Sequence, residues 1–401
     1  MHDIFSRLFE MTALSAITYK TIIMWIIACV LLYLGIKKKF EPLLLVPIGF
    51  GVLLANFPGS TMGIVDASEV ALDGHRYKNL FEIASEYGIM NFLYYSLIKT
   101  GFLPPIIFMG VGALTDFGPM LRNLRLAFFG AAAQIGIFSV LIISVLLGFD
   151  LNEAASLGII GGADGPTAIY TTIKLAPHLL GPIAIAAYSY MALVPVIVPA
   201  VAKLFMKEKE FKINMKEMDK KYPSKNVIKN LKTAKIIFPI ALGTVIAILV
   251  PSSVPLLGML LFGNLVKEIG TSTKRLAEAA QGTILNTATI FLGLAVGATM
   301  TENVFLTPKT LGIVVGGFIA FAISIAGGIL AVKVYNMFSK KKINPLVGAT
   351  GLSAVPMASR VANELALKYD PKNHILQYCM ASNISGVIGS AVAAGILISL
   401  V

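Results

Sequence analysis

Long apolar segments separated by short polar ones dominate the pattern of this 401-residue chain. Many of these segments approach the roughly 20 residues that an α-helix needs to cross a membrane. We find none of the short alternating segments that a membrane β-barrel would show. The pattern predicts an all-α polytopic membrane protein with about 9–11 spans. The apolar segments fall near residues 21–36, 42–56, 89–100, 102–118, 126–148, 179–202, 236–250, 254–266, 284–300, 311–336 and 376–400.

Two further apolar segments, residues 156–173 and 344–360, are interrupted by glycine and proline. Glycine lets the backbone leave the helix, and Pro166 removes a backbone donor. Within a membrane, such backbone is tolerated only where protein or a water-filled cavity surrounds it. We therefore expect two broken or re-entrant helical segments inside the protein.

An internal repeat links these two segments. "GADGPTA" at 162–168 matches "GATGLSA" at 348–354, an offset of 186 residues. Three weaker matches follow in the same order along the chain, and four matches in one order predict a duplication. The weaker matches are "VPIGFG" at 46–51 with "FPIALG" at 238–243, "SLIKTG" at 96–101 with "NLVKEIG" at 264–270, and "GVGALT" at 110–115 with "AVGATM" at 295–300.

The positive charges predict that the two halves are inverted. "RNLR" at 122–125 precedes one apolar span, whereas "SKKK" at 339–342 follows the span that matches it. Because cytoplasmic loops retain Lys and Arg, the two spans then run in opposite directions. The expected parts are residues 1–39 as a surface segment and first membrane helix, 42–204 as the first inverted repeat, 205–233 as a basic cytoplasmic linker, and 234–401 as the second inverted repeat.

Composition agrees with a membrane protein, since only 13% of the residues are charged and the mean hydropathy is +0.81. We attribute the net charge of +12 to cytoplasmic loops, not to nucleic-acid binding. The basic linker is either a solvated loop or a contact with an acidic subunit or lipid headgroups. The two cysteines and four histidines show no metal-ligand spacing, and no nucleotide-binding motif indicates an ATP-driven pump.

Asp164 is the only acid in the first broken segment. A lone carboxylate at membrane depth is costly unless it is paired or neutralised, so it marks a cation or proton site. Paired broken segments in inverted repeats are typical of secondary transporters, whose ion site lies where the segments meet. Glycine carbonyls and the Thr167 hydroxyl offer hard oxygen ligands, and Thr350 and Ser353 occupy the matching place in the second half. The alternative is that Asp164 caps a half-helix near the surface.

Other polar side chains also lie in apolar surroundings. Tyr188, Tyr190 and Asn383 are either packing hydrogen-bonders or ligands, and Asn383 is the best ion-ligand candidate among them. Arg360 at the end of the second broken segment suits an anion site, because guanidinium binds carboxylates bidentately. Its alternative role is a snorkelling or salt-bridged residue, with Glu364 four residues further along.

The motifs "GGADGPTAIY" and "NPLVGATGLSAVPMASRVAN" resemble the β subunit of the biotin-dependent, sodium-translocating decarboxylases of oxaloacetate, glutaconyl-CoA and methylmalonyl-CoA. The resemblance continues to "SNISGVIGSAVAAGIL" and covers nearly the whole chain. It implies that a carboxyltransferase subunit loads a biotin carrier subunit, and that the β subunit decarboxylates the carboxybiotin. That reaction consumes a proton and drives Na⁺ outward. It also implies a small single-helix membrane subunit, a homo-oligomer, the bacterial inner membrane, and biotin that is not covalently bound to this chain.

The resemblance also implies roles for individual residues. The Na⁺ and proton ligand of the first motif falls on Asp164, and we expect Arg360 and Tyr190 to complete the catalytic set. Two other functions compete from the residues alone: a Na⁺-coupled organic-anion transporter and a Na⁺/H⁺ antiporter. The sequence does not identify the organic substrate. The expected ion-binding residues are Asp164, Asn383, Ser353, Asn344, Thr350 and Gly348.

Overall fold

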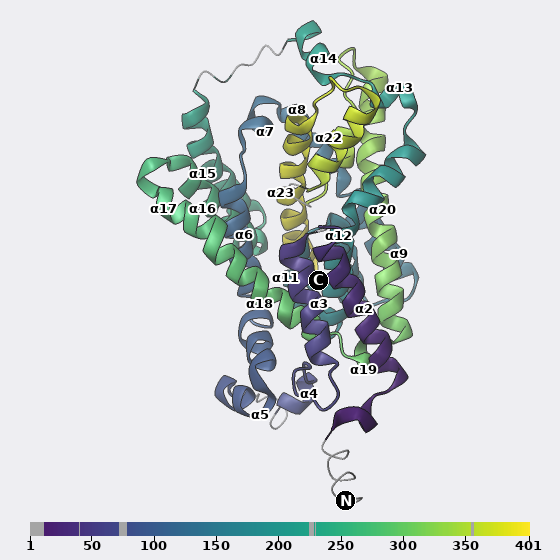
Figure 1. The fold of residues 1–401 in the computed structure, drawn as a ribbon. Coiled ribbons are helices and arrows are strands. Elements are labelled where there is room, and N and C mark those ends of the chain that lie inside the picture. The colour runs from purple at the N-terminus through teal and green to yellow at the C-terminus, as the bar shows by residue number, and fades with distance from the viewer. Residues whose placement is uncertain (1–11, 40, 72–77, 224–227, 229, 354–356) are drawn as a thin grey trace, which may run out of the picture. The chain divides into compact units, whose positions relative to one another are not determined.

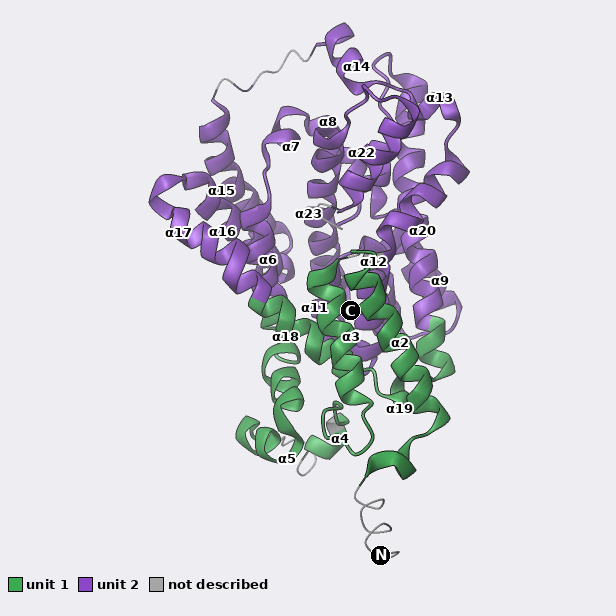
Figure 2. Cartoon of the chain, viewed as in Figure 1, with its two compact units in different colours: residues 1–103, 287–312 green, residues 104–286, 313–401 purple. Residues whose placement is uncertain are grey.

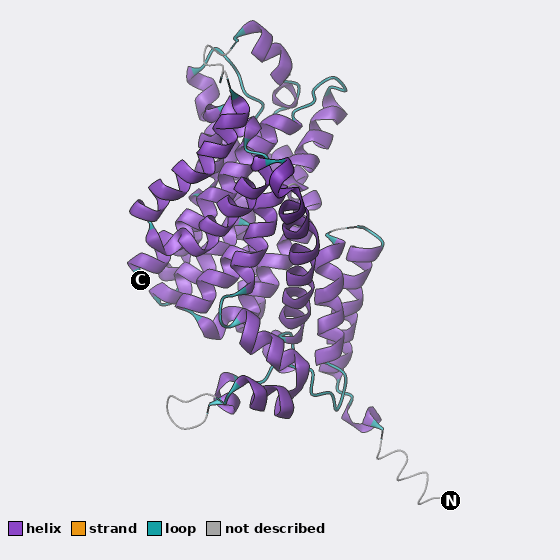
Figure 3. Cartoon of the chain, turned by 90° about the vertical axis from the view of Figure 1, so that its left-hand side faces the viewer, coloured by secondary structure: helices purple, strands orange, loops and turns teal. Residues whose placement is uncertain are grey.

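The computed structural model describes residues 12–39, 41–71, 78–223, 228, 230–353 and 357–401. Their regular structure is helical (Figures 1 and 3). Within this part of the chain, seven helices are long and apolar enough to cross a membrane, or nine if two bent helix pairs each form one span. This confirms the expected all-α multi-span fold, and the expected number of 9–11 spans is reached only when both bent pairs count as spans.

Helices cover the apolar segments identified from the sequence. η1 (Ala13–Ala16) and α2 (Tyr19–Ile36) come first. The first predicted half then contains α3 (Pro42–Ala55), α4 (Ala67–Val70), α5 (Leu80–Leu93), η2 (Tyr94–Ile98), α6 (Leu103–Leu114), α7 (Gly118–Arg122), α8 (Leu124–Ala133), α9 (Ile135–Leu146), α10 (Leu151–Gly158), η3 (Ile159–Gly162), α11 (Gly165–Leu175), η4 (Pro177–Leu179) and α12 (Leu180–Phe205).

The basic linker forms two short helices, α13 (Glu208–Phe211) and α14 (Met215–Lys221). The second predicted half contains α15 (Leu231–Leu249), η5 (Pro251–Ser253), α16 (Val254–Ile269), η6 (Thr271–Thr273), α17 (Lys274–Ala279), η7 (Ala280–Ile284), α18 (Leu285–Ala298), α19 (Glu302–Phe305), α20 (Pro308–Phe338), α21 (Leu346–Ala349), α22 (Met357–Tyr369) and α23 (Leu376–Leu400).

The four repeat matches fall at corresponding places in these helices. Pro47 lies inside α3 and Pro239 inside α15. Gly101 and Gly270, the last residues of the matching segments 96–101 and 264–270, both have a positive φ. "GVGALT" and "AVGATM" end α6 and α18, and the two glycine-rich motifs contain the breaks before α11 and after α21. This correspondence supports the duplication, although the inverted repeat itself stays a prediction.

Contacts between Cα atoms divide the chain into two compact units (Figure 2). Unit 1 comprises residues 1–103 and 287–312, and unit 2 comprises residues 104–286 and 313–401. Each unit therefore takes segments from both predicted halves. Both broken segments and α23 belong to unit 2, so all residues of the candidate site lie within one unit.

Glycines let the backbones around the second broken segment approach closely. A Cβ on Gly386 of α23 would lie 2.2 Å from the carbonyl oxygen of Gly351, and one on Gly130 of α8 would lie 2.2 Å from that of Ser382. Small residues at such crossings are typical of membrane helix packing. The break after α21 is therefore packed tightly between α8 and α23.

Candidate functional site

Asp164 lies in the break between η3 and α11. The preceding Ala163 has φ 54°, in the left-handed region, so the chain changes direction here. Oδ1 of Asp164 accepts the backbone N–H of Thr167 at 3.1 Å and caps α11. Asp164 therefore does cap a helix, as the alternative interpretation expects. That interpretation places the cap near the surface, however, whereas Asp164 is buried and only 4% exposed. The positive end of the α11 dipole favours a negative charge at this place.

Two serine hydroxyls reach the other carboxylate oxygen. Ser353, from the second broken segment, donates to Oδ2 of Asp164 at 2.6 Å, and Ser390 of α23 donates to it at 2.9 Å. The backbone N–H of Ser353 also donates to the carbonyl of Gly162 at 3.1 Å. The two broken segments therefore meet at Asp164 through both side-chain and backbone contacts.

Tyr188 of α12 covers the start of α11. A Cβ on Gly165 would lie 2.4 Å from Cε1 of Tyr188, so the ring packs directly on the glycine that follows Asp164. Tyr188 is 2% exposed, and its hydroxyl has no hydrogen-bond partner among the described residues. A buried hydroxyl without a partner is costly, and this one lies near the acid.

Asn383 and Thr350 hold the second broken segment in place. The Asn383 amide nitrogen donates to the carbonyls of Leu352 at 2.5 Å and Thr350 at 3.3 Å. The Thr350 hydroxyl in turn lies 3.1 Å from the carbonyl of Cys379 in α23. Asn383 thus holds the carbonyl of Leu352, and the next residue, Ser353, donates to Asp164. Asn383 and Thr350 therefore act on Asp164 through the second broken segment.

The donor set suits a small hard cation. It consists of one carboxylate, serine hydroxyls and backbone carbonyls, which are oxygen ligands suited to an alkali cation more than to a transition metal. The described part of the chain contains no group of three or more His, Cys, Asp or Glu side chains that could hold a metal ion.

Two predicted ion ligands lie elsewhere. The Asn344 amide nitrogen donates to the carbonyls of Phe211 at 3.0 Å and Ile213 at 3.1 Å, so Asn344 attaches the second broken segment to the basic linker. Gly348 packs against α20, where its Cβ would lie 2.0 Å from the carbonyl oxygen of Gly328. In this conformation Asn344 and Gly348 support the broken segment and do not contact Asp164.

Tyr190 and Arg360 do not contact the acid either. The Tyr190 ring packs edge-to-face on Phe318, with ring centroids 6.0 Å apart. Arg360 is exposed in α22 and forms no ion pair or hydrogen bond with any described residue. Glu364 is also exposed, and no ion pair between it and Arg360 is found among the described residues, which leaves the alternative of a salt-bridged Arg360 without support here. Arg360 is therefore available to an anion.

The site also contains residues to which the sequence motifs give no definite role. One signal could have found Ser390, because it follows Asn383 by seven residues, which is two turns along the same helix face. Tyr188 precedes Tyr190 by two residues, so the two rings point to different sides of α12. The helix packing decides which of them faces Asp164.

The two basic clusters, "RNLR" and "SKKK", line one cavity of about 700 Å³. Arg122, Arg125, Lys340 and Lys341 line it together with residues of the linker. Lys341 pairs with Asp219 at 2.6 Å. Inversion of the repeats requires both clusters at the same side of the membrane, and their place around one cavity agrees with it.

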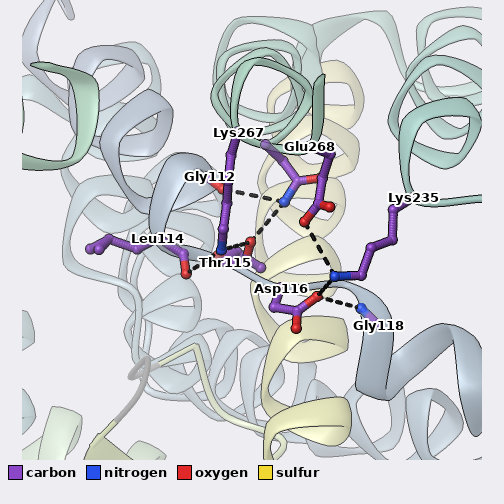
Figure 4. A network of polar contacts seen from close by, with 9 residues as sticks. Gly112, Leu114, Thr115, Asp116, Gly118, Lys235, Lys267 and Glu268 are labelled. Carbon is purple, nitrogen blue, oxygen red and sulfur yellow. Dashed lines mark hydrogen bonds and ion pairs between the residues drawn. The ribbon is translucent and has the colours of Figure 1, made fainter. Parts of the chain in front are cut away.

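A second polar cluster connects α6, α15 and α16 (Figure 4). Lys235 contacts Asp116 at 2.5 Å and Glu268 at 3.5 Å, and Asp116 accepts the N–H of Gly118 at 2.9 Å. Lys267 donates to the carbonyls at the end of α6, including that of Thr115 at 2.9 Å. A cation at a helix C-terminus is favourable, and the cluster holds the three helices together.

We expect Asp116→Asn to destabilise the fold by about 1 kcal/mol at neutral pH, because it removes the half-exposed ion pair with Lys235, whereas the asparagine oxygen can still accept the Gly118 N–H. Burial raises the pKa of Asp116, but Lys235 and the Gly118 N–H outweigh it and lower the pKa overall. The stabilisation is therefore present above the unfolded pKa near 3.9 and is lost as the pH falls through the folded pKa. Thermal unfolding in detergent should show the difference from wild type at pH 7 and a smaller one near pH 3. Glu208→Gln, in an exposed helical pair, is the control and should change little.

Comparison with known proteins decides the family. A family model described as the Na⁺-transporting oxaloacetate decarboxylase beta subunit matches residues 20–401. The chain belongs to this family. This match confirms the resemblance seen in the two motifs. The protein is a membrane subunit of a Na⁺-transporting decarboxylase.

Relatives from three enzymes are about equally similar. The chain is 45% identical to oxaloacetate decarboxylase beta chain 2 of Salmonella typhi, with 94% of each chain covered. It is 46% identical to the methylmalonyl-CoA decarboxylase subunit beta of Propionigenium modestum over 98% of each chain. It is 45% identical to the glutaconyl-CoA decarboxylase subunit beta of Acidaminococcus fermentans, over 96% of this chain and 94% of that one. Since the identities are alike, the β subunit does not reveal the organic substrate.

Proposed function

We propose that this subunit decarboxylates carboxybiotin and uses the reaction to move Na⁺ outward, with a proton taken up in exchange at Asp164. The observation that carries the proposal is the contact of the buried Asp164 carboxylate with Ser353 and Ser390. A single acid thereby joins both broken segments and α23. Rearrangement of any of the three changes the ligands of a bound cation.

Ser390 offers a way to exchange the occupant of the site. Its hydroxyl has one proton and two acceptors in reach, Oδ2 of Asp164 at 2.9 Å and the carbonyl of Val387 at 3.0 Å. When the site holds no cation, the proton stabilises the carboxylate. When Na⁺ enters, the proton turns to Val387 and a lone pair of the hydroxyl becomes a ligand. Protonation of Asp164 removes its charge and weakens the hold on Na⁺.

Carboxybiotin reaches this subunit from other chains. A carboxyltransferase subunit and a biotin carrier subunit supply it, so biotin is not covalently bound here, and a small single-helix subunit accompanies the chain in the bacterial inner membrane. Homo-oligomerisation is proposed on the family resemblance alone. Each net positive charge exported against 100 mV costs about 2.3 kcal/mol, which decarboxylation must supply, whereas a one-for-one exchange of Na⁺ for a proton moves no net charge.

The test uses the purified subunit with its small membrane partner in sealed liposomes, supplied with free carboxybiotin. CO₂ release and ²²Na⁺ transport are measured together, with K⁺ replacing Na⁺ as the control. We expect CO₂ release to require Na⁺ and Na⁺ transport to require carboxybiotin. Na⁺-driven uptake of an organic anion without carboxybiotin would instead make the protein a transporter.

Arg360 is proposed as the partner of the carboxybiotin carboxylate, because it is exposed and has no described ion-pair partner. Arg360→Lys keeps the charge but loses the bidentate geometry, so we expect the KM for carboxybiotin to rise about tenfold. Steady-state CO₂ release at saturating Na⁺ measures this. Arg275→Lys, an exposed arginine in α17, is the matched control. Equal KM values in the two variants would remove Arg360 from the site.

A further inference from the structure

Gln134 interrupts the long helical segment of α8 and α9. It lies between Ala133, the last residue of α8, and Ile135, the first of α9, and is 6% exposed. A glutamine buried this deeply in a membrane segment is costly unless both ends of its amide are satisfied. Among the described residues, only the nitrogen end has partners.

Three backbone carbonyls determine the orientation of the amide. The amide nitrogen lies 3.1 Å from the carbonyl of Gly130, 3.3 Å from that of Gly386 and 3.4 Å from that of Gly351. The opposite orientation would place the amide oxygen against three carbonyl oxygens. Because oxygen acceptors repel one another, the hydrogen bonds themselves assign the nitrogen to this side. The oxygen must therefore point away from the three carbonyls.

The amide oxygen lies beside Gly162, two residues before Asp164. It is buried and has no hydrogen-bond partner among the described residues. A Cβ on Gly162 would lie 3.7 Å from this oxygen and 3.1 Å from Cβ of Ser390, which donates to Asp164. The amide also packs on Gly389, the neighbour of Ser390, whose Cβ would lie 3.3 Å from the amide carbon. Gln134 and Ser390 thus approach the same face of the first broken segment.

We propose that the Gln134 side-chain oxygen is a further ligand of the Na⁺ that Asp164 binds, an assignment that rests on the proposed function. A neutral amide oxygen is a suitable ligand for a hard cation, and a bound cation supplies the partner that this oxygen lacks. The same amide holds α8 to α23 and to the second broken segment through its nitrogen. Gln134 therefore connects the occupancy of the ion site to the packing of three elements.

The test measures Na⁺ binding without turnover. The full chain, purified in detergent, is titrated with NaCl against choline chloride at constant ionic strength, and the thermal midpoint is recorded at each point. Wild type is compared with Gln134→Met, which keeps the volume but loses the oxygen. Gln134→Asn, which keeps the amide but withdraws its oxygen by one methylene, serves where the methionine variant does not fold. Gln377→Met, at an exposed position of α23, is the matched control.

We expect the half-saturating Na⁺ concentration to rise about tenfold in the Gln134 variants and to stay unchanged in Gln377→Met. The ratio of Li⁺ to Na⁺ affinity should change as well, which loss of packing alone would not cause. Gln134 variants could instead have a lower thermal midpoint in choline chloride but an unchanged half-saturating Na⁺ concentration, while Asp164→Asn loses the response to Na⁺. That outcome would overturn the role of Gln134 and leave the ion site at Asp164 in place. A wild-type chain without any response to Na⁺ would overturn the proposed function, and this assignment with it.

Discussion

Asp164→Asn is expected to remove Na⁺-dependent turnover while leaving the chain folded. Asparagine keeps the side-chain shape and can still accept the N–H of Thr167, so α11 keeps its cap. The variant cannot supply the negative charge that attracts Na⁺, nor take up and release a proton. We expect CO₂ release from free carboxybiotin to fall about a thousandfold, or about 4 kcal/mol in the activation barrier.

Asp150→Asn is the matched control for this experiment. Asp150 caps α10 in the same way, since its Oδ1 accepts the N–H of Glu153 at 2.7 Å, but it lies at the surface. If Asp164 were only a cap, both variants would lose a little stability and keep their Na⁺ dependence. A large loss in Asp164→Asn with normal turnover in Asp150→Asn separates the ion site from the cap.

The meeting of Asp164 with Ser353 could be predicted from the sequence because two different signals point to it. The repeat pairs the two broken segments, and the glycines in each show where the backbone leaves the helix. An acid without a counter-charge in an apolar segment then requires polar partners nearby. The matching segment is the part of the sequence most able to supply them, and Ser353 does so.

The rest of the site could not be predicted, because it depends on how helices rotate against one another. Ser390 lies in a run of small residues with several serines, and although it shares a helix face with Asn383, the sequence does not show that this face turns to the acid. Gln134 looked like any polar residue in an apolar span, since its three partners are backbone carbonyls, two of them far away in sequence. Asn344 lies in the second glycine-rich motif, but its amide nitrogen donates to the carbonyl of Phe211 in the basic linker and not to the ion site.

Gly165→Ala is expected to be the most damaging small substitution beside the acid. Its Cβ would lie 2.4 Å from Cε1 and 2.7 Å from Cζ of Tyr188, whereas real Cβ atoms essentially never approach within 3.0 Å. Either α11 moves or the Tyr188 ring turns away, and both displace the neighbouring Asp164. A displacement of about 1 Å at a reacting centre costs about a hundredfold in rate, so we expect Na⁺-dependent CO₂ release to fall by that factor.

A second substitution distinguishes this clash from a loss of backbone freedom. If the ring causes the defect, Gly165→Ala combined with Tyr188→Leu should recover most of the lost rate, because leucine vacates the space that the new methyl group needs. Gly316→Ala in α20 is the matched control, since nothing lies within 4 Å of its Cβ. Turnover in that variant should stay at the wild-type level. A double variant as slow as Gly165→Ala alone would mean that the glycine serves the break itself and that the Tyr188 ring does not position Asp164.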